Sequence, residues 1–212
     1  MIDTTPIPAQ MSNLLIIFAH PAYEKSRVHK RLVKKVRALE GITFHDLYEA
    51  YPDFDIDVKR EQELLLQHDT IILLHPFYWY SSPAIIKQWQ DLVLEHGWAY
   101  GKNGTRLTGK RMMNAISTGG TMETYSGQGR NRYTIRELLS PFEQTARLCN
   151  MEYMSPFTIT GTHQLNDADI ELHAIQFEQL LVGLRTNRIT DKECKSVKYL
   201  EELVPVPQTV QS

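Results

Sequence analysis

Residues that can bind a phosphate group follow the first apolar run of the chain. The run ends at Phe18, and His20 and the pair Ser26-Arg27 come next, at the start of a helical pattern. Backbone N–H groups at a helix N-terminus attract anions, and a serine hydroxyl and a guanidinium add strong hydrogen bonds. His20 or His29 can contribute a ring nitrogen. This stretch therefore suits a phosphate.

A second stretch, residues 70–83 (TIILLHPFYWYSSP), offers flat aromatic surfaces. Its apolar start suits a strand buried on both faces, and it leads into Tyr78, Trp79 and Tyr80. Open α/β sheets bind flat ligands beyond the carboxyl ends of their strands. Two interpretations stay open from these residues alone: the rings form a ligand platform, or they only fill the core or a subunit interface.

The third stretch consists of Ser117, Thr118, Gly119 and Gly120, and it follows another apolar run. Glycine lets the backbone approach a ligand closely, although an ordinary turn would use the same residues. The backbone N–H groups of such a loop can stabilise negative charge on a reduced ring. A phosphate site at one end and a site for a flat redox ring at the other indicate FMN or FAD.

Five apolar runs alternate with helical patterns, which predicts a parallel, doubly wound α/β sheet with helices on both faces. The predicted strands are residues 14–18, 42–46, 71–74, 112–117 and 153–160. No GxGxxG motif follows the first run, so the flavodoxin-like order 2-1-3-4-5 fits better than a dinucleotide-binding Rossmann domain. In that order the three stretches converge on one crevice. Their convergence favours the ligand platform over the plug.

Capping residues indicate where four of the helices begin. The signals are Ser26, Asp57, the pair Ser82-Pro83, and a capping box formed by Ser140 and Glu143. Residues 1–12 are expected to be an extended or disordered N-terminus and residues 13–186 the flavodoxin-like domain. Residues 187–212 are expected to form a C-terminal tail, poorly ordered toward its end.

Composition excludes several classes of function. The formal charge of −2 argues against nucleic-acid binding, and the apolar runs are too short to cross a bilayer. No secretory signal pattern opens the chain, so a cytoplasmic location is expected. Cys149 is expected to be a core residue and Cys194 a thiol of the tail. His20 and His75 lack a nearby carboxylate, so no metal is expected.

Residues 14–181 resemble the flavodoxin-like NAD(P)H:quinone oxidoreductases of the DT-diaphorase type. Within that group they are most similar to the ancillary subunits of glutathione-regulated potassium-efflux systems. The segments that carry the resemblance are residues 18–21 (FAHP), 51–57 (YPDFDID), 75–76 (HP), 80–81 (YS), 97–101 (GWAYG), 117–120 (STGG) and 140–142 (SPF).

The resemblance implies a role for each stretch. His20 and the residues Ser26, Arg27, Val28 and His29 would hold the flavin phosphate. The ring would lie against Pro76, Phe77, Tyr78, Trp79 and Tyr80, and its pyrimidine edge against residues 117–120. Tyr125 falls where the family places a tyrosine that polarises the flavin during hydride transfer, and Asn131 stands at the position of that tyrosine's histidine partner. His29 replaces a common Asn, and Tyr78 a common Gln.

The implied activity is transfer of a hydride from NAD(P)H through FMN, or alternatively FAD, to a quinone. The family also implies a homodimer whose interface includes the helix at residues 83–94, although the apolar face of that helix is equally consistent with simple core packing. The alternative is an ancillary subunit that activates a membrane potassium-efflux protein from the inner face of the membrane. That function predicts an exposed patch outside the crevice, such as the basic face of the first helix. An acidic flavodoxin-type electron carrier fits less well, since the chain is near neutral.

Overall fold

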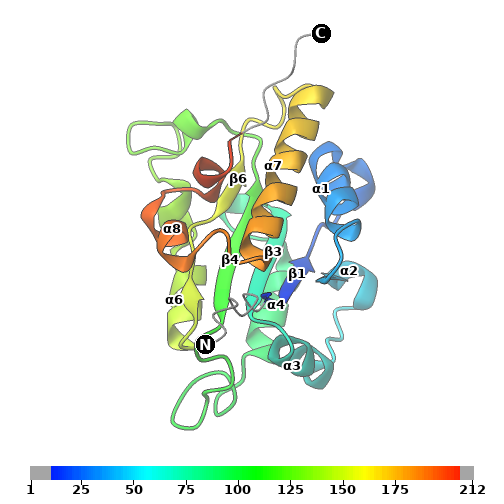
Figure 1. The fold of residues 1–212 in the computed structure, drawn as a ribbon, viewed down its shortest axis with the longest axis vertical. Coiled ribbons are helices and arrows are strands. Elements are labelled where there is room, and N and C mark those ends of the chain that lie inside the picture. The colour runs from blue at the N-terminus through cyan, green and yellow to red at the C-terminus, as the bar shows by residue number, and fades with distance from the viewer. Residues whose placement is uncertain (1–10, 206–212) are drawn as a thin grey trace, which may run out of the picture.

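A single parallel sheet forms the centre of the computed structural model, which describes residues 11–205 (Figure 1). The strand order is β2-β1-β3-β4-β5, and β6 also pairs with β4. The strands are β1 (Leu14–Phe18), β2 (Ile42–Asp46), β3 (Thr70–Pro76), β4 (Arg111–Ser117), β5 (Glu152–Tyr153) and β6 (Phe157–Ile159). The predicted fold class and strand order are therefore confirmed.

The fifth position of the sheet differs in detail from the prediction. One strand was expected over residues 153–160, but two short strands occupy this edge, and both pair in parallel with β4. Pro156 lies between them and has no N–H to offer a ladder, which explains the interruption. The carbonyl of Pro156 accepts a hydrogen bond from Leu200 N instead (2.9 Å).

Helices cover both faces of the sheet because its strands are apolar on both sides. In β1 the side chains of Leu15 and Ile17 belong to one hydrophobic core, and those of Leu14, Ile16 and Phe18 to the other. The helices are α1 (Arg27–Arg37), α2 (Leu47–Ala50), α3 (Val58–Leu66), α4 (Ala84–Val93), α5 (Ile135–Leu138), α6 (Ser140–Leu148), α7 (Asp167–Arg185) and α8 (Asp191–Ser196). Helices α1 and α7 lie side by side on one face, and α3, α4 and α6 lie behind the sheet in Figure 1.

Two of the four predicted helix-capping signals are confirmed and two are wrong. Ser26 and Asp57 cap α1 and α3 by accepting from His29 N and Arg60 N. Ser82 does not cap α4, because its hydroxyl donates to the carbonyl of Pro83, which is itself the N-cap. The expected box at Ser140 is also wrong.

The capping box of this region lies earlier in the chain. Thr134 and Glu137 form it at the start of α5. Leu139 ends α5 and is at the same time the N-cap of α6, so Ser140 is already the first residue of α6. Two helices that follow each other without a connecting loop leave no position for a capping serine between them.

Structure continues beyond residue 186, where the sequence predicts a tail. Helix α8 buries Cys194, and the 3-10 turn at Leu200–Leu203 buries Leu200 completely. Cys194 is therefore a core residue like Cys149, not a tail thiol. The signal was weak because only a few apolar residues anchor this segment, too few to give a helical period. Residues 206–212, with the end of the expected tail, lie outside the described range.

The N-terminal expectation falls mainly on residues 1–10, which also lie outside the described range. Of the remainder, Ser12 is buried, its N–H donates to the carbonyl of Arg185 (2.8 Å), and its hydroxyl accepts from Arg111 (2.6 Å). The fold therefore includes at least one residue before the expected boundary at 13.

A buried carboxylate joins the helices behind the sheet. Glu61 of α3 is fully buried, and its two oxygens accept hydrogen bonds from three side chains. The donors are His45 Nε2 (2.8 Å), the Tyr51 hydroxyl (2.6 Å) and Trp89 Nε1 (2.8 Å). Burial opposes ionisation of Glu61, but these bonds outweigh it, so its pKa lies below the usual value. This cluster ties β2, α3 and α4 together.

Candidate functional site

Two adjoining cavities lie beyond the carboxyl ends of β1, β3 and β4. They have volumes of about 440 and 460 Å³, and the side chains of Phe77 and Tyr78 line both. The first is lined by His20, Ala22, Lys25, Ser26, Arg27, Val28, Pro76, Phe77, Tyr78, Ser117, Gly119, Thr162 and His163. The second is lined by Phe77, Tyr78, Trp79, Tyr80, Gly120, Thr124, Tyr125, Arg130 and Asn131. The convergence of the three stretches is a feature of the structure.

The first cavity is electropositive at the end formed by α1. The helix begins at Arg27, so its first N–H groups have no intrahelical acceptor and face this end of the fold. Lys25 and Arg27 add two cations to the lining. A helix N-terminus with two cations is suited to an anionic group such as a phosphate.

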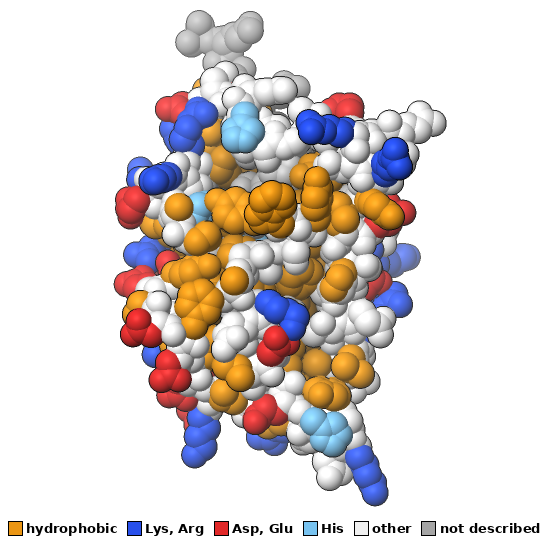
Figure 2. All heavy atoms as spheres, turned by 180° about the vertical axis from the view of Figure 1, so that it is seen from behind, with side chains coloured by type: hydrophobic (Ala, Val, Ile, Leu, Met, Phe, Trp, Pro, Cys, Tyr) orange, Lys and Arg blue, Asp and Glu red, His pale blue; other side chains and the backbone are white. Residues whose placement is uncertain are grey.

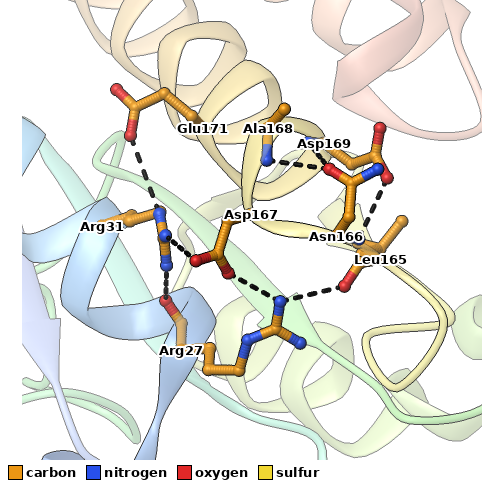
Figure 3. Close-up of polar contacts among 8 residues, drawn as sticks. All are labelled: Arg27, Arg31, Leu165, Asn166, Asp167, Ala168, Asp169 and Glu171. Atoms are coloured by element: carbon orange, nitrogen blue, oxygen red, sulfur yellow. Dashed lines mark hydrogen bonds and ion pairs between the residues drawn. The ribbon is translucent and has the colours of Figure 1, made fainter.

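Arg27 is held by the first residue of α7 and by the loop before that helix (Figure 3). Its Nη2 donates to Asp167 Oδ1 (2.7 Å) and to the carbonyl of Leu165 (3.1 Å). The other oxygen of Asp167 pairs with Arg31 (3.0 Å), which also reaches Glu171 (3.9 Å). Arg27 therefore keeps a lining position, while Asp167 already neutralises part of its charge.

Two histidines near the first cavity, His20 and His75, have different surroundings. His20 lines the cavity, and its Nδ1 accepts from Ala22 N (3.1 Å), which places the proton of the neutral ring on Nε2. Burial lowers the pKa of His20. His75 is fully buried, with Nδ1 donating to the carbonyl of Pro76 (2.9 Å) and Nε2 accepting from Asn114 (3.0 Å). Burial lowers its pKa to about 4.

His29 does not line the first cavity, contrary to the expectation of a direct phosphate ligand. It is only 1% exposed, and its ring lies behind that of His20, with centroids 4.9 Å apart. Position 29 is the third residue of α1, and its side chain points back into the core beside Phe18 (5.8 Å between centroids). Its Nδ1 lies within hydrogen-bonding distance of Ser26 Oγ (3.1 Å), and Ser26 itself lines the cavity.

The aromatic loop combines exposed rings with an uncommon backbone. Trp79 and Tyr80 have φ of 51° and 63°, in the left-handed region that bulky residues rarely adopt. Trp79 is 93% exposed and Tyr80 49%, whereas Phe77 is buried. Backbone strain next to exposed rings is typical of a binding loop and not of a core plug.

Hydrophobic side chains form a band across the upper part of the face seen in Figure 2, and charged side chains lie mostly toward its margins. This face is opposite to the one in Figure 1 and is covered by α4 and α6. Tyr78, Trp79, Tyr80 and Tyr133 are among the exposed large hydrophobic residues of the described chain. The aromatic loop is therefore accessible to a ligand.

The glycine loop after β4 brings the backbone close to two rings. A Cβ at Gly119 would lie 2.5 Å from His163 Nε2, and one at Gly120 would lie 3.1 Å from Tyr125 Cε2. Thr118 lines neither cavity; it is buried, and its hydroxyl donates to the carbonyl of Gly120 (2.6 Å). Thr118 therefore shapes the loop, and the glycines provide the close approach.

The second cavity contains the two residues expected to act in catalysis. Tyr125 is 8% exposed, and its ring lies 5.9 Å from that of Phe77. Asn131 accepts a hydrogen bond from the Tyr80 hydroxyl (3.4 Å), and its N–H donates to the carbonyl of Thr124. The side chain of Asn131 thus connects the aromatic loop to the loop after β4.

Several lining residues were not predicted. Thr162 and His163 follow β6, so the rule that ligands bind at strand carboxyl ends would have found them. Lys25 directly precedes Ser26 in the chain. Thr124 and Arg130 lie in a polar loop whose conformation has no sequence signal.

Within residues 11–205 no three His, Cys, Asp or Glu side chains are grouped so that they could hold a metal ion. Nor does any helix in this range have the length and apolar character needed to cross a membrane.

Residues 12–181 match the family described as having a flavodoxin-like fold. The chain is 46% identical over 157 residues to the uncharacterized NAD(P)H oxidoreductase YrkL of Bacillus subtilis (strain 168), covering 74% of this chain and 90% of that protein. It is 40% identical over 175 residues to the glutathione-regulated potassium-efflux system ancillary protein KefG of Enterobacter sp. (strain 638), covering 82% and 96%.

Solved structures agree with this result. General stress protein 14 of Treponema denticola, in complex with FMN, superposes with a TM-score of 0.78 at 39% identity and covers 81% of this chain and 99% of its own. An NADPH-quinone reductase from P. pentosaceus gives 0.72 at 32% identity and covers 79% and 96%. The order of the strands, the converging loops and these similarities lead to one conclusion: the chain belongs to the flavodoxin-like fold family that includes NAD(P)H oxidoreductases.

Proposed function

We propose that the protein is an FMN-dependent NAD(P)H:quinone oxidoreductase. The observation that carries the proposal is the pair of adjoining cavities, one electropositive and one aromatic, that share Phe77 and Tyr78. A phosphate and a flat ring joined by a short linker need such a combination. The names of the relatives support the nicotinamide and quinone substrates, and the FMN-bound relative supports FMN over FAD.

The first cavity would hold the phosphate end of the cofactor. The N-terminus of α1, the Ser26 hydroxyl and the side chains of Lys25 and Arg27 provide the donors and the positive charge. His20 adds the N–H of its Nε2, because Nδ1 already accepts from the backbone. A terminal phosphate group, which carries up to two negative charges, fits this end of the cavity.

The wall shared by the two cavities would hold the ring. Pro76, Phe77 and Tyr78 offer flat contacts, and Ser117, Gly119 and Gly120 offer backbone at close range. When bound, FMN supplies the ability to accept a hydride from NAD(P)H and to pass two electrons to an acceptor. The residues of the second cavity, with Trp79 and Tyr80 at its rim, would then bind the nicotinamide and the quinone in turn.

Tyr125 and Asn131 would have different tasks in this reaction. The Tyr125 hydroxyl can donate a hydrogen bond to an oxygen atom where negative charge develops. Asn131 has no titrating proton, so it would fix the loop through Tyr80 and would not relay protons.

Flavin binding and reduction test the function directly. The purified protein is titrated with FMN, FAD and riboflavin, and the flavin fluorescence is followed. The FMN complex is then mixed with NADH or NADPH without oxygen, and a quinone is added last. We expect FMN to bind with a Kd in the micromolar range or below, to bleach with a reduced nicotinamide, and to regain its colour with the quinone. A Kd of about 10⁻⁴ M corresponds to a binding free energy of roughly −5 to −6 kcal/mol. Absence of flavin binding up to that concentration would contradict the proposal.

A second function is favoured by the 40% identity to KefG over 96% of that protein. The chain would then act from the inner face of a membrane as an ancillary subunit of a potassium-efflux protein. The basic face of α1 is not the free patch this predicts, since Arg27, Arg31 and Lys35 are paired with Asp167, Glu171 and Glu178 of α7. Restored potassium efflux in cells that lack their own ancillary subunit would support this function, and its absence would count against it.

The proposal includes a homodimer, as expected from the family resemblance. The apolar side of α4, considered for the interface, packs inward through Ile85, Ile86, Trp89 and Val93, so these residues belong to the core. An interface on this side would have to use the exposed residues of α4, such as Leu92. Light scattering after size exclusion would give about 49 kDa for a dimer, twice the 24.5 kDa of one chain.

A further inference from the structure

Two polar side chains, His75 of β3 and Asn114 of β4, are fully buried within the sheet. Burial of a ring nitrogen or an amide costs free energy unless its polar atoms find partners. Asn114 Nδ2 lies 3.0 Å from His75 Nε2, and Asn114 Oδ1 lies 2.7 Å from the hydroxyl of Tyr153 in β5. The other nitrogen of His75, Nδ1, lies 2.9 Å from the carbonyl oxygen of Pro76. A continuous chain of hydrogen bonds therefore runs from Tyr153 to Pro76 at the end of β3.

The carbonyl of Pro76 fixes the direction of this chain. A carbonyl oxygen can only accept, so Nδ1 of His75 must carry a proton. Burial lowers the pKa of His75 to about 4, so the ring is neutral at pH 7 and its Nε2 carries no proton. Nε2 must then accept from the NH₂ group of Asn114, which turns the Asn114 oxygen toward the hydroxyl of Tyr153. Burial raises the pKa of Tyr153, so this hydroxyl keeps the proton that it donates.

The peptide unit between Pro76 and Phe77 is held at both ends. The ring of His75 donates to its carbonyl, and its N–H, which belongs to Phe77, donates to the carbonyl of Ser117 (2.8 Å). Pro76 and Phe77 line the first cavity, and Phe77 also lines the second. Because both polar groups of this peptide unit are paired within the protein, the wall of the cavities presents the two rings and not an unpaired carbonyl.

The aromatic loop that follows this peptide unit depends on a fixed starting point. Trp79 and Tyr80 adopt left-handed backbone angles, and such strain persists only where the surrounding structure holds it. Within the loop, Ser81 N donates to the carbonyl of Tyr78 (3.0 Å), and the Tyr80 hydroxyl reaches Asn131 at 3.4 Å. The two bonds on the preceding peptide unit therefore hold the start of the loop against relaxation.

We infer that His75 is a positioning residue that keeps the Pro76 carbonyl turned into the core, so that the wall beside the aromatic loop stays apolar for the ring of the cofactor. This inference rests on the proposed function, because it assumes that a flavin ring lies against Pro76 and Phe77. Without the bond from His75 the carbonyl would lose its partner, and rotation of the peptide unit would bring it to the water of the cavity. Asn114 and Tyr153 keep His75 in the tautomer that donates to Pro76.

The direction of the chain is measurable without any ligand or activity. A two-bond proton–nitrogen correlation spectrum of the protein labelled with nitrogen-15 distinguishes a ring protonated at Nδ1 from one protonated at Nε2. His75→Asn identifies the resonances of His75 by their loss. We expect a neutral ring with its proton on Nδ1 at pH 7. A proton on Nε2, or a charged ring at this pH, would overturn the inference.

Binding of FMN and riboflavin then separates the ring contact from the phosphate contact, since the two flavins differ only by the phosphate. His75→Asn and His75→Gln form a matched pair. The side-chain nitrogen of asparagine can take the place of Nδ1, whereas that of glutamine extends farther from the backbone and leaves the Pro76 carbonyl without a donor. We expect His75→Gln to weaken FMN and riboflavin by the same factor, roughly tenfold, as for one lost hydrogen bond. His75→Asn should bind both flavins within about threefold of the natural protein.

A change at Asn114 tests the chain from its other end. Asn114→Leu keeps a side chain of similar size but removes the group that donates to His75 Nε2, so the ring is no longer held in one tautomer. It should weaken both flavins by a common factor no larger than that of His75→Gln. In the double variant, Asn114→Leu with His75→Gln, the flavins should bind no more weakly than in His75→Gln alone, because both changes act on the same bond to Pro76. Circular dichroism at the titration temperature verifies that each variant is folded.

The outcomes separate this inference from the proposed function. If the natural protein binds neither flavin, the function fails, and the tautomer spectrum still decides the direction of the chain. If the natural protein binds both flavins and His75→Gln binds them equally well, the function stands and the role of His75 is refuted. A selective loss of FMN in His75→Gln would place the effect at the phosphate end and overturn the inference. Equal losses in His75→Asn and His75→Gln, or additive losses in the double variant, would show that His75 is only a packing residue.

Discussion

Replacement of the buried carboxylate behind the sheet should destabilise the protein strongly. In Glu61→Gln the side chain keeps its shape but loses its charge and exchanges one acceptor oxygen for an NH₂ group. If the remaining oxygen faces His45 and Tyr51, the new NH₂ group faces Trp89 Nε1, and two donors then meet without an acceptor. The Trp89 side chain is only 2% exposed, so its N–H is shielded from bulk solvent.

The size of the loss follows from the three hydrogen bonds. A buried donor left unpaired costs about 1–3 kcal/mol, and each of the other two bonds loses about 1 kcal/mol when its acceptor becomes neutral. The free energy of unfolding should therefore fall by about 3–5 kcal/mol. For a chain of this size that corresponds to a drop in Tm of roughly 6–20 °C.

Urea unfolding at pH 7, followed by fluorescence, measures this loss. Glu63→Gln is the matched control, because Glu63 is exposed on the same helix and the substitution is identical. It should change the free energy of unfolding by less than about 0.5 kcal/mol. The pKa of Glu61 lies below the usual value, so its contribution is present above about pH 4.3 and is lost as the pH falls further. A loss below about 1 kcal/mol at pH 7 would refute the argument, because an unpaired buried donor alone exceeds it.

Three further predictions concern the C-terminal segment and the cavities. Burial raises the pKa of Glu201 to about 7 although Thr158 donates to both carboxylate oxygens. The stabilising contribution of the protonated Glu201 is therefore complete below about pH 4.3 and is lost as the pH rises through 7. In urea unfolding the natural protein should lose stability relative to Glu201→Gln between pH 5 and pH 8, and parallel curves for the two proteins would contradict this. Gly119→Ala should change the free energy of unfolding by less than about 1 kcal/mol, because the exposed His163 ring can rotate away from the new Cβ. It should weaken FMN binding about tenfold in a fluorescence titration. Unchanged FMN affinity would mean that the loop does not contact the cofactor. Tyr125→Phe should slow reduction of bound FMN by NAD(P)H about tenfold to a hundredfold in stopped-flow measurements while the flavin content stays the same, and loss of flavin would instead make Tyr125 a packing residue.

The sheet was predictable because its signal is simple. Buried parallel strands read as continuous apolar runs, and β1 and β3 are buried along their whole length. The two short edge strands were not separable by this signal, since the break at Pro156 is a local effect. The elements after residue 186 were missed because Cys194 and Leu200 anchor them through single buried side chains.

The candidate site was predictable to the level of its loops. Apolar runs that end in polar, aromatic or glycine-rich residues, with a known strand order, place those loops at one edge of the sheet. The direction of each side chain depends on packing that the sequence does not encode locally. Thus His29 points inward while Ser26 faces the cavity, and Trp79 is exposed while Phe77 is buried.

Anaerobic reduction of the FMN-loaded protein tests the central claim most directly. The protein is loaded with FMN, freed of excess, and its visible spectrum is recorded before and after one equivalent of NADPH or NADH, and again after a quinone. The account predicts a yellow protein that bleaches with a reduced nicotinamide and recovers its full absorbance with the quinone. A protein that stays colourless after loading, or a bound FMN that neither nicotinamide reduces, would contradict it.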